Sequence, residues 1–325
     1  MNTPEFIYGN IAPVFTAFKD DLTLDDNGQK NILDWILATD SVSAYFVRSG
    51  LGQMYTFSAG DIRQIAKTAC AHMAGKAPVL VGCNGVWDRD RTKLPDPVVF
   101  QRQAIELSAF ATDVGAEGVV HTVPEMIRPT NGESAQDVVL RYFESLASAV
   151  DAPIFIYQPP GVDVDYQMSP ALLAKLADIP NIVAAKVSTN DAEYLFNLIH
   201  ATKDKDFSVI AGAETSYYAA LYAGARAVIG QGCTINPQII KKMQQRHEAG
   251  DRAGVLEAQH SINLLVKECR NSVDFFKRYL NEKGYSVGQA FRSAPDNLYI
   301  QYPQPLTDDE YSRFKDILER ELAKL

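Results

Sequence analysis

Short apolar runs alternate with longer amphipathic stretches along most of this chain of 325 residues. The apolar runs are nearly continuous in Val, Ile, Ala and aromatic residues, which is typical of strands that are covered on both faces. This pattern predicts strands at residues 11–15, 44–48, 78–82, 118–122, 153–157, 182–186, 208–211 and 227–230.

The stretches between the apolar runs have helical spacing. Small and apolar residues recur on one helical face over residues 104–111 and again over residues 138–147. Gly115 and Gly224 stand shortly before two of the expected strands, where a glycine often ends a helix. Roughly eight strand–helix units favour an α/β fold of the (β/α)8 TIM barrel type. A doubly wound sheet is the alternative, although no glycine-rich dinucleotide fingerprint follows the first strand.

The strand pattern stops near residue 237. Helical patterns then cover residues 239–248, 252–280 and 308–325, so we expect a barrel over residues 1–236 and a C-terminal helical domain over residues 237–325. Residues 86–97 form a long charged segment after the third strand. Loops at the carboxyl ends of barrel strands carry function. Charged surface loops are common, however, and a solvated insertion is the favoured interpretation.

Composition and charge narrow the classes of function. The chain is 46% hydrophobic with a formal net charge of −9, which argues against a nucleic-acid or anionic-membrane partner but leaves room for a local anion site. The four cysteines are far apart, so neither a disulfide framework nor a structural zinc site is expected. Neither a signal-peptide pattern nor an apolar run of roughly 20 residues is present, and we expect a soluble, cytoplasmic protein.

Lys186 is the most informative candidate, because it ends the apolar run at residues 181–186. Burying an ammonium is costly unless the group is paired or neutralised. The lysine either reaches from the strand end to solvent or attacks a carbonyl to form a Schiff base. Tyr157 ends the neighbouring strand and would lie beside it at the barrel mouth. A phenol there can move protons, although a buried tyrosine with a satisfied hydroxyl is the alternative.

The second strand ends in the segment Arg48-Ser49-Gly50-Leu51-Gly52-Gln53. Glycines after a small hydroxyl residue let backbone N–H groups face inward, and such a turn can hold a carboxylate without a fixed positive charge. A tight strand-to-helix turn with no ligand is the alternative interpretation.

Several segments, in the right order, resemble the dihydrodipicolinate synthase/N-acetylneuraminate lyase family of class I aldolases. They cover residues 13–18, 49–53, 156–160, 180–186 and 224–230, and the match runs over roughly residues 8–300. The segment at 180–186 is similar to the family's P-N-I-V-G-x-K sequence, which bears the Schiff-base lysine. The resemblance implies a (β/α)8 barrel with a C-terminal helical domain, usually a tetramer. It also implies that Lys186 forms the imine and that Tyr157 shuttles the proton.

The departures from that family concern the substrate. Dihydrodipicolinate synthases have threonines where this chain has Gly50 and Leu51, and an arginine where it has Val162. Their P-Y-Y-x-x-P segment is replaced by residues 124–129, which contain no tyrosine. The lysine-biosynthesis reaction is therefore not expected. The turn at residues 50–53 also resembles the G-T-G-E turn of keto-deoxy-sugar-acid dehydratases.

Two carboxylates and an amide are further candidates for substrate binding. Glu125 follows the fourth strand and either contacts substrate or lies in solvent. Glu214 stands where sialic-acid lyases keep an acidic residue for substrate hydroxyls, although a glutamate favoured by a helix dipole is the alternative. We expect Gln53, Glu125 or Glu214 to hold the hydroxyls of the substrate.

The resulting hypothesis is a Schiff-base-forming lyase, an aldolase or a dehydratase, that acts on a 2-oxo acid such as a 2-keto-3-deoxy sugar acid. The imine polarises the carbonyl as a metal would, so no metal or organic cofactor is expected. The only expected partners are the small-molecule substrate and further copies of the chain, as a tetramer or dimer. A catalytically altered or inactive family member that binds 2-oxo acids, or acts as a regulatory barrel, is the alternative.

Overall fold

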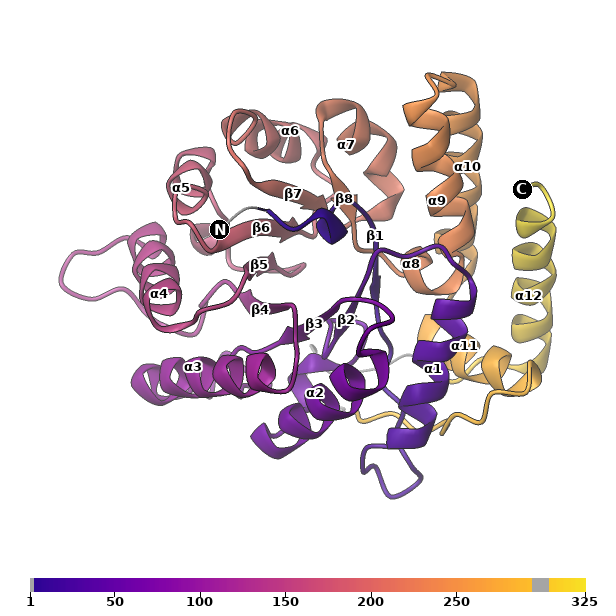
Figure 1. Ribbon diagram of the computed structural model, residues 1–325, viewed down its shortest axis with the longest axis horizontal. Helices are drawn as coiled ribbons and strands as arrows, with labels where there is room; N and C mark the ends of the chain where they lie inside the picture. Colours follow the sequence, from indigo (N-terminus) through magenta and orange to yellow (C-terminus); the bar gives the residue numbers. More distant parts are fainter. Residues whose placement is uncertain (1–2, 294–303) are drawn as a thin grey trace.

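Eight parallel strands close into a barrel in the computed structural model, which describes residues 3–293 and 304–325 (Figure 1). Each strand pairs with the next one along the chain, and the last pairs with the first. The strands are β1 (Gly9–Pro13), β2 (Ala44–Val47), β3 (Val79–Gly82), β4 (Gly118–Thr122), β5 (Ile154–Gln158), β6 (Ile182–Val187), β7 (Ser208–Ala211) and β8 (Ala227–Val228). The predicted (β/α)8 barrel is therefore confirmed.

The strand ends differ from the prediction by one or two residues, except in β4 and β7, which have the predicted bounds. β1 begins earlier than expected because Gly9 pairs with Ala227 of β8. β8 is shorter than its apolar run. It pairs with β1 at two positions, Ala227 with Gly9 and Val228 with Asn10. The ends of a strand depend on its neighbours in the barrel, which the pattern of one run does not contain.

Helices surround the barrel (Figure 1). They are α1 (Asp26–Ala38), α2 (Ala59–Met73), α3 (Pro97–Asp113), α4 (Ala135–Ala149), α5 (Pro170–Leu176), α6 (Ala192–Ala201), α7 (Tyr217–Ala223) and the short α8 (Gly232–Ile235). The predicted helix stops are confirmed, because Gly115 and Gly224 have φ values of 97° and 104°. This left-handed conformation is easy for glycine and ends a helix cleanly.

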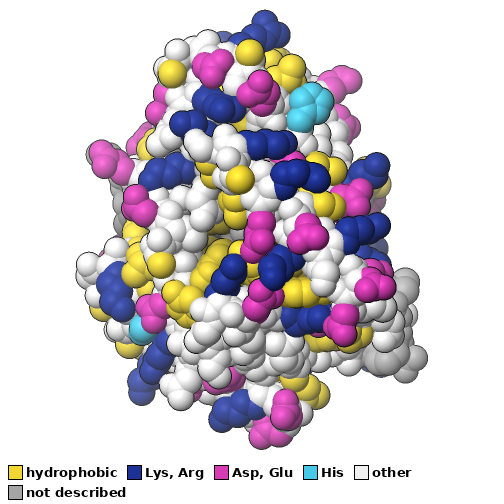
Figure 2. Space-filling view, turned by 90° about the vertical axis from the view of Figure 1, so that its right-hand side faces the viewer, with side chains coloured by type: hydrophobic (Ala, Val, Ile, Leu, Met, Phe, Trp, Pro, Cys, Tyr) yellow, Lys and Arg dark blue, Asp and Glu magenta, His cyan; other side chains and the backbone are white. Residues whose placement is uncertain are grey.

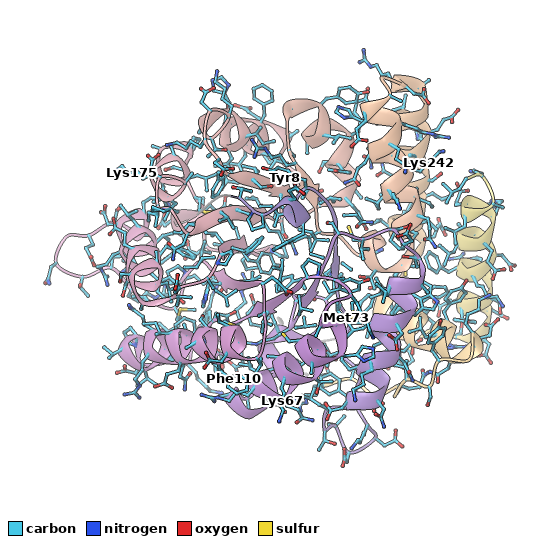
Figure 3. All side chains as sticks on the ribbon, viewed as in Figure 1. Tyr8, Lys67, Met73, Phe110, Lys175 and Lys242 are labelled. Atoms are coloured by element: carbon cyan, nitrogen blue, oxygen red, sulfur yellow. The ribbon has the colours of Figure 1, made fainter. Side chains whose placement is uncertain are left out.

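Side chains fill two layers of the molecule (Figure 3). Phe46, Leu80 and Phe155 point into the barrel with residues of the other strands. A second, larger layer lies between the strands and the helices and contains Phe100 of α3 and Tyr142 of α4. Alternate strand residues supply the two layers, as the two faces of a pleated strand require. Side chains therefore fill the interior of the barrel. A ligand site is expected at the carboxyl ends of the strands, where TIM barrels carry their sites.

The C-terminal region is helical, as predicted, but one expected helix is two. Residues 252–280 divide into α10 (Arg252–Glu268) and α11 (Ser272–Glu282). The prediction of one helix was wrong because the side chain of Asn271 accepts a hydrogen bond from the backbone N–H of Asp274 and caps a new helix. The region begins with α9 (Pro237–Glu248) and ends with α12 (Asp308–Leu322). The division of the chain into domains at residue 237 stays a prediction.

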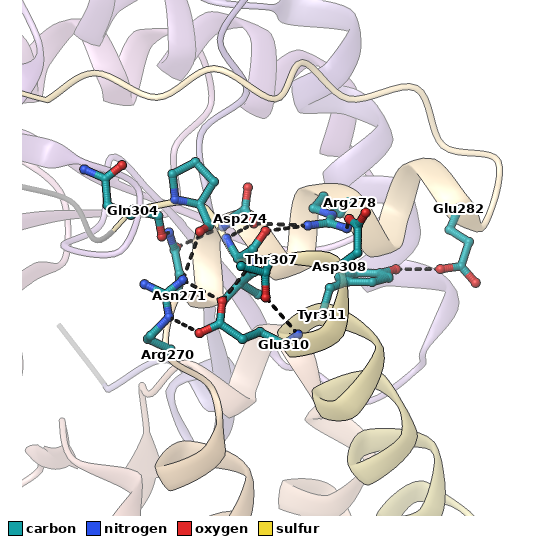
Figure 4. A network of polar contacts seen from close by, with 12 residues as sticks. Arg270, Asn271, Asp274, Arg278, Glu282, Gln304, Thr307, Asp308, Glu310 and Tyr311 are labelled. Carbon is teal, nitrogen blue, oxygen red and sulfur yellow. Dashed lines mark hydrogen bonds and ion pairs between the residues drawn. The ribbon is translucent and has the colours of Figure 1, made fainter.

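Ion pairs connect α12 to α11 and to the loop between α10 and α11 (Figure 4). Arg278 contacts Asp308 at 2.8 Å, and Arg270 contacts Glu310 at 2.9 Å. On the face formed by the C-terminal helices, basic and acidic side chains are interspersed, so no broad surface of one charge forms there (Figure 2). Among the described residues, no helix combines the length and apolar character that a membrane crossing requires.

Candidate active site

A cavity of about 580 Å³ opens at the carboxyl ends of the strands. This is the face at which TIM barrels carry their sites. Six of the eight residues predicted for the site line it: Gly50, Leu51, Gln53, Tyr157, Lys186 and Glu214. The other two, Ser49 and Glu125, lie close by but are not part of the lining.

Lys186 and Tyr157 lie side by side, because β5 and β6 pair in a register that aligns them. The Lys186 Nζ is 4.2 Å from the centre of the Tyr157 ring. Lys186 is only 7% exposed, and among the described residues no carboxylate lies within ion-pair distance of its Nζ. A buried amine without an ion pair is costly to maintain, so these contacts do not fit a lysine that reaches into solvent.

The turn after β2 packs closely on Tyr157. A Cβ atom at Gly50 would lie 2.9 Å from the Tyr157 hydroxyl oxygen, so only glycine allows this approach. Ser49 stabilises the turn through two hydrogen bonds. Its hydroxyl donates to the carbonyl oxygen of Val14 and accepts from the N–H of Gly52. Ser49 therefore shapes the turn, and Gly50 and Leu51 of the turn line the cavity.

Arg48 places a fixed positive charge beneath this turn, which the sequence analysis did not expect. Its guanidinium is fully buried and donates to the carbonyl oxygens of Met54, Gly82 and Asn84. Burial lowers the pKa of Arg48 to about 10, which still leaves the group charged at neutral pH. The guanidinium holds the ends of β2 and β3 together and favours an anion in the turn above it.

Gln53 lines the cavity and carries a buried acceptor. Its side chain is buried, and its Nε2 donates to the carbonyl oxygen of Arg292 at 2.5 Å. Within the described part of the chain its Oε1 has no hydrogen-bond donor. A buried acceptor without a donor is costly, and its predicted contact with a substrate hydroxyl stays a prediction.

Glu214 lies in a short 3-10 helix, η4 (Glu214–Ser216), directly after β7. Its Oε2 accepts a hydrogen bond from the N–H of Gly232 at 2.7 Å. Burial raises the pKa of Glu214 to about 7, against the opposing effects of this hydrogen bond and of the Lys186 charge. The carboxyl can therefore either accept from a substrate hydroxyl or donate to one near neutral pH.

Glu125 does not lie in solvent, and its predicted contact with substrate stays a prediction. The carboxylate is buried, is not part of the cavity lining, and contacts Arg89, which lines the cavity, and Arg91. Its Oε1 lies 2.7 Å from Arg89 Nε and its Oε2 lies 2.7 Å from Arg91 Nη2. Glu125 also accepts a hydrogen bond from the N–H of Asp163. Its visible role is to position these two arginines.

Arg89 is a lining residue that the sequence analysis missed. It belongs to the charged segment at 86–97, but the prediction of a solvated insertion is wrong here, because Arg89 is 3% exposed and lines the cavity. Its guanidinium lies 5.5 Å from the ring centre of Tyr55, another lining residue that was missed. The one available signal was Trp87, an aromatic residue two positions before Arg89 that is also buried.

Hydroxyl and amide groups complete the lining, and none of them was predicted. They follow β6, β7 and β8 and comprise Ser188, Thr189, Asn190, Thr215 and Gln231. Such groups suit a ligand with several hydroxyls. Over the described ranges, no group of three or more His, Cys, Asp or Glu side chains is arranged to hold a metal ion.

Comparisons with known proteins agree with this geometry. The family model of the dihydrodipicolinate synthetase family matches residues 7–319. The 4-hydroxy-tetrahydrodipicolinate synthase of Dechloromonas aromatica is 28% identical over 262 residues, which are 81% of this chain and 82% of the relative. The Escherichia coli protein YagE, provisionally named a 2-dehydro-3-deoxy-D-gluconate aldolase, is 28% identical over 75% of this chain and 76% of its own.

Solved structures show the same fold. YagE of Escherichia coli K12, solved in complex with pyruvate, superposes with a TM-score of 0.78 at 24% identity and covers 97% of this chain and 98% of its own. N-acetylneuraminate lyase of Mycoplasma synoviae superposes with a TM-score of 0.78 at 18% identity over 98% of this chain and 99% of its own. The family model spans nearly the whole chain, and the chain therefore belongs to the dihydrodipicolinate synthetase family of class I lyases.

Proposed function

We propose that this lyase forms a Schiff base through Lys186 and acts on a hydroxylated 2-oxo acid, such as a 2-keto-3-deoxy sugar acid. The observation that carries the proposal is the buried amine of Lys186, 4.2 Å from the Tyr157 ring centre in a cavity of about 580 Å³. The likeness to YagE, named for a 2-keto-3-deoxy acid, supports the substrate class. A homo-oligomer, dimer or tetramer, is part of the same proposal.

The chemistry begins at the ketone of the substrate. Lys186 Nζ attacks C2, and loss of water from the carbinolamine gives an iminium that withdraws electrons from C3. In an aldolase, loss of the C4 hydroxyl proton then breaks the C3–C4 bond and leaves the enamine of pyruvate. In a dehydratase, C3 loses a proton and the C4 hydroxyl leaves as water. Tyr157 carries the proton in either case.

Different groups would bind the other parts of the substrate. The backbone of Gly50 and Leu51, above the buried charge of Arg48, would hold the carboxylate next to the ketone. Gln53 Oε1 and the Glu214 carboxyl would hold hydroxyls further along the chain. These contacts suit a sugar-derived acid better than a plain aliphatic one, because each buried polar group needs a partner.

Synthesis of dihydrodipicolinate is not part of this proposal, although several relatives are named for that pathway step. The Tyr157 hydroxyl packs on Gly50, so no side-chain hydroxyl stands at that position to relay a proton. Val162 and Met126 are buried and do not line the cavity, so they offer nothing to a second substrate.

A substrate panel tests the proposed function. Pyruvate released from a set of 2-keto-3-deoxy sugar acids is measured with lactate dehydrogenase, and dehydration is followed by mass spectrometry of the product. A parallel assay supplies pyruvate and aspartate semialdehyde. We expect turnover of at least one sugar acid and negligible condensation with the semialdehyde. Efficient condensation would contradict the substrate assignment, and binding of all these acids without turnover would favour the binding or regulatory barrel.

A further inference from the structure

One face of α10 packs against η4, the short helix that brings Glu214 to the cavity (Figure 1). Gln259, Asn263 and Val266 lie on this face, because they follow one another at intervals of four and three residues. Val266 lines the cavity, whereas Gln259 is buried and is not part of the lining. The C-terminal helices therefore supply part of the cavity wall, and the proposed reaction assigns nothing to them.

Gln259 uses its whole side-chain amide to hold the segment that carries Glu214. Its Nε2 donates to the carbonyl oxygens of Glu214 and Thr215, at 2.9 and 3.3 Å. Its Oε1 accepts from the backbone N–H of Tyr218 at 2.6 Å. The side-chain oxygen of Asn263 accepts from the same Nε2 at 2.8 Å, which fixes the orientation of the amide. Both polar atoms of this buried amide are therefore satisfied.

η4 and α7 depend on this contact, because their own N-cap residues do not cap them. Within the described part of the chain, neither Ala213 before η4 nor Ser216 before α7 makes a side-chain capping hydrogen bond. By contrast, Ser58 caps α2 with its own hydroxyl. The first N–H groups of a helix lack partners unless a cap supplies one. Gln259, from a different helix, provides the acceptor for the N–H of Tyr218.

Two glycines after β8 enclose the carboxyl of Glu214. A Cβ atom at Gly230 or Gly232 would lie 2.5 or 2.6 Å from Glu214 Oε2, so a side chain at either position would displace the carboxyl. The N–H of Gly232 donates to the same oxygen at 2.7 Å. The carboxyl fits this space only while η4 keeps its position, and Gln259 binds the backbone of η4.

We propose that Gln259 is a positioning residue for Glu214: it fixes η4 so that the carboxyl meets the hydroxyls of the substrate. Gln259 is 6% exposed and does not line the cavity, so it acts through Glu214 rather than on the ligand. The C-terminal helical region then contributes to the selection of hydroxylated substrates. This inference deepens the proposed function and rests on it, because it concerns the carboxyl that the proposal assigns to substrate hydroxyls.

A double-mutant cycle with Gln259→Met and Glu214→Gln tests whether Gln259 acts through the carboxyl. KM and kcat are measured at pH 8 for the sugar acid of the substrate panel with the highest kcat/KM. Glu214→Gln should raise KM about tenfold, the weight of one charge-assisted hydrogen bond. Gln259→Met should raise KM about threefold or more, with kcat changed by less than about twofold. The double variant should have the KM of Glu214→Gln alone. Additive effects on log KM, or an unchanged KM in Gln259→Met, would overturn the proposal.

Ser261→Ala is the matched control on the same helix. The Ser261 hydroxyl donates to the carboxylate of Glu321 in α12, so this change removes a hydrogen bond of α10 that does not involve η4. Its KM should equal that of the wild-type protein, and a similar rise in both variants would contradict a specific role of Gln259. If Gln259→Met does not fold, as judged by circular dichroism, Gln259→Glu replaces it. That variant keeps the acceptor for Tyr218 and loses the donor to the Glu214 carbonyl oxygen.

Hydrogen–deuterium exchange without ligand separates this inference from the proposed function. The N–H of Gly232 reports on the Glu214 carboxyl, and the N–H of Tyr218 reports on Gln259. Both should exchange faster in Gln259→Met than in the wild-type protein or in Ser261→Ala. Unchanged exchange at Gly232 would overturn the positioning role and leave the Schiff-base proposal standing. If no acid of the panel is turned over, the proposed function fails, and exchange still decides whether Gln259 holds the carboxyl.

Discussion

Three buried charged side chains meet in the cavity, and each is held in a different way. Lys186 lies against the ring of Tyr157, and Arg89 is ion-paired with Glu125. Glu214 accepts a hydrogen bond from the backbone N–H of Gly232. The ring leaves the Lys186 amine able to react, and the N–H leaves the Glu214 carboxyl able to titrate near neutral pH. The ion pair fixes the charge of Arg89. At the scale of single residues, this difference separates Lys186 and Glu214, which the proposed chemistry uses, from Arg89, which the ion pair with Glu125 holds in the cavity wall.

The Tyr157 hydroxyl is the proposed proton carrier. Tyr157→Phe should lower kcat by roughly 10²–10⁴, the usual effect of losing a general acid or base. Pyruvate binding should change much less, because the ring that packs on Lys186 is kept. Steady-state kinetics and calorimetry on the same preparation measure the two quantities. An unchanged kcat would mean that another group or a water molecule moves the proton.

Glu214 should give the reaction a pH dependence near neutrality. With a pKa raised to about 7, the carboxyl loses its proton as the pH rises from 6 to 8 and becomes a pure acceptor for substrate hydroxyls. KM for a hydroxylated substrate should therefore fall over this range. Glu214→Gln should flatten the profile, because an amide does not titrate. A wild-type profile that survives in Glu214→Gln would assign the titration to another group.

Other titratable groups near Glu214 could also contribute to the pH dependence of KM. They are Lys186 from β6, Cys233 from α8 and Cys269 from the end of α10. Burial raises the pKa of Cys269 to about 12 and raises that of Cys233 even further, so both remain neutral thiols between pH 6 and 8. Pyruvate, which has no hydroxyl for Glu214 to bind, is the control ligand.

At the scale of elements, the close approach of the β2 turn to β5 sets the geometry around Tyr157. Gly50→Ala would bring a Cβ within 2.9 Å of the Tyr157 hydroxyl oxygen and push the phenol aside. A displacement of about 1 Å can cost roughly 10²-fold in rate, so we expect kcat to fall by about 10–10² with little loss of stability.

Gly60→Ala is the control for that substitution. Gly60 lies in α2, where a Cβ meets only Ser58 Oγ at an ordinary 3.6 Å. The Gly60→Ala variant should have the activity of the wild-type protein. Its thermal stability should equal or slightly exceed that of the wild-type protein, because alanine favours a helix. Kinetics and thermal melting of the two variants make the comparison. Equal activity in both would show that the turn does not constrain Tyr157.

Regular elements made part of the site predictable from sequence. The ends of strands locate Lys186 and Tyr157, because neighbouring strands of a parallel barrel end at one mouth. Arg89 and Glu125 lie in irregular segments, and their directions depend on an ion pair that exists only in the folded protein. Similarly, the break between α10 and α11 depends on the Asn271 cap, which the helical spacing of apolar residues does not reveal.

At the scale of the whole molecule, the C-terminal helices pack on the barrel through aromatic rings and one buried lysine. Phe276 of α11 lies 5.1 Å from Phe15 and 5.1 Å from Trp35, measured between ring centres. Lys277 is fully buried between these parts, with its Nζ donating to the carbonyl oxygen of Ala290 and lying 5.5 Å from the ring centre of Phe18. Its contacts connect the first and last parts of the chain.

Burial lowers the pKa of Lys277 to about 7, against the opposing charges of Asp274 and Asp25. The unfolded state therefore binds more protons between about pH 7 and 10, and this group destabilises the fold most below pH 7. Lys277→Met should raise the free energy of unfolding by about 1–3 kcal/mol at pH 6, with a gain that shrinks toward pH 10. Urea titrations at several pH values measure it, and a gain that grows with pH would contradict this reasoning.

The central claim is that Lys186 forms a covalent imine with a 2-oxo acid. The most direct measurement is borohydride reduction in the presence of pyruvate, followed by peptide mapping by mass spectrometry. We predict one stable adduct, on Lys186, that is absent from Lys186→Ala and present in Lys277→Met, whose substitution removes the other buried lysine of the described chain. Circular dichroism verifies that both variants are folded. An adduct on a different residue, or none in the wild-type protein, would contradict the account.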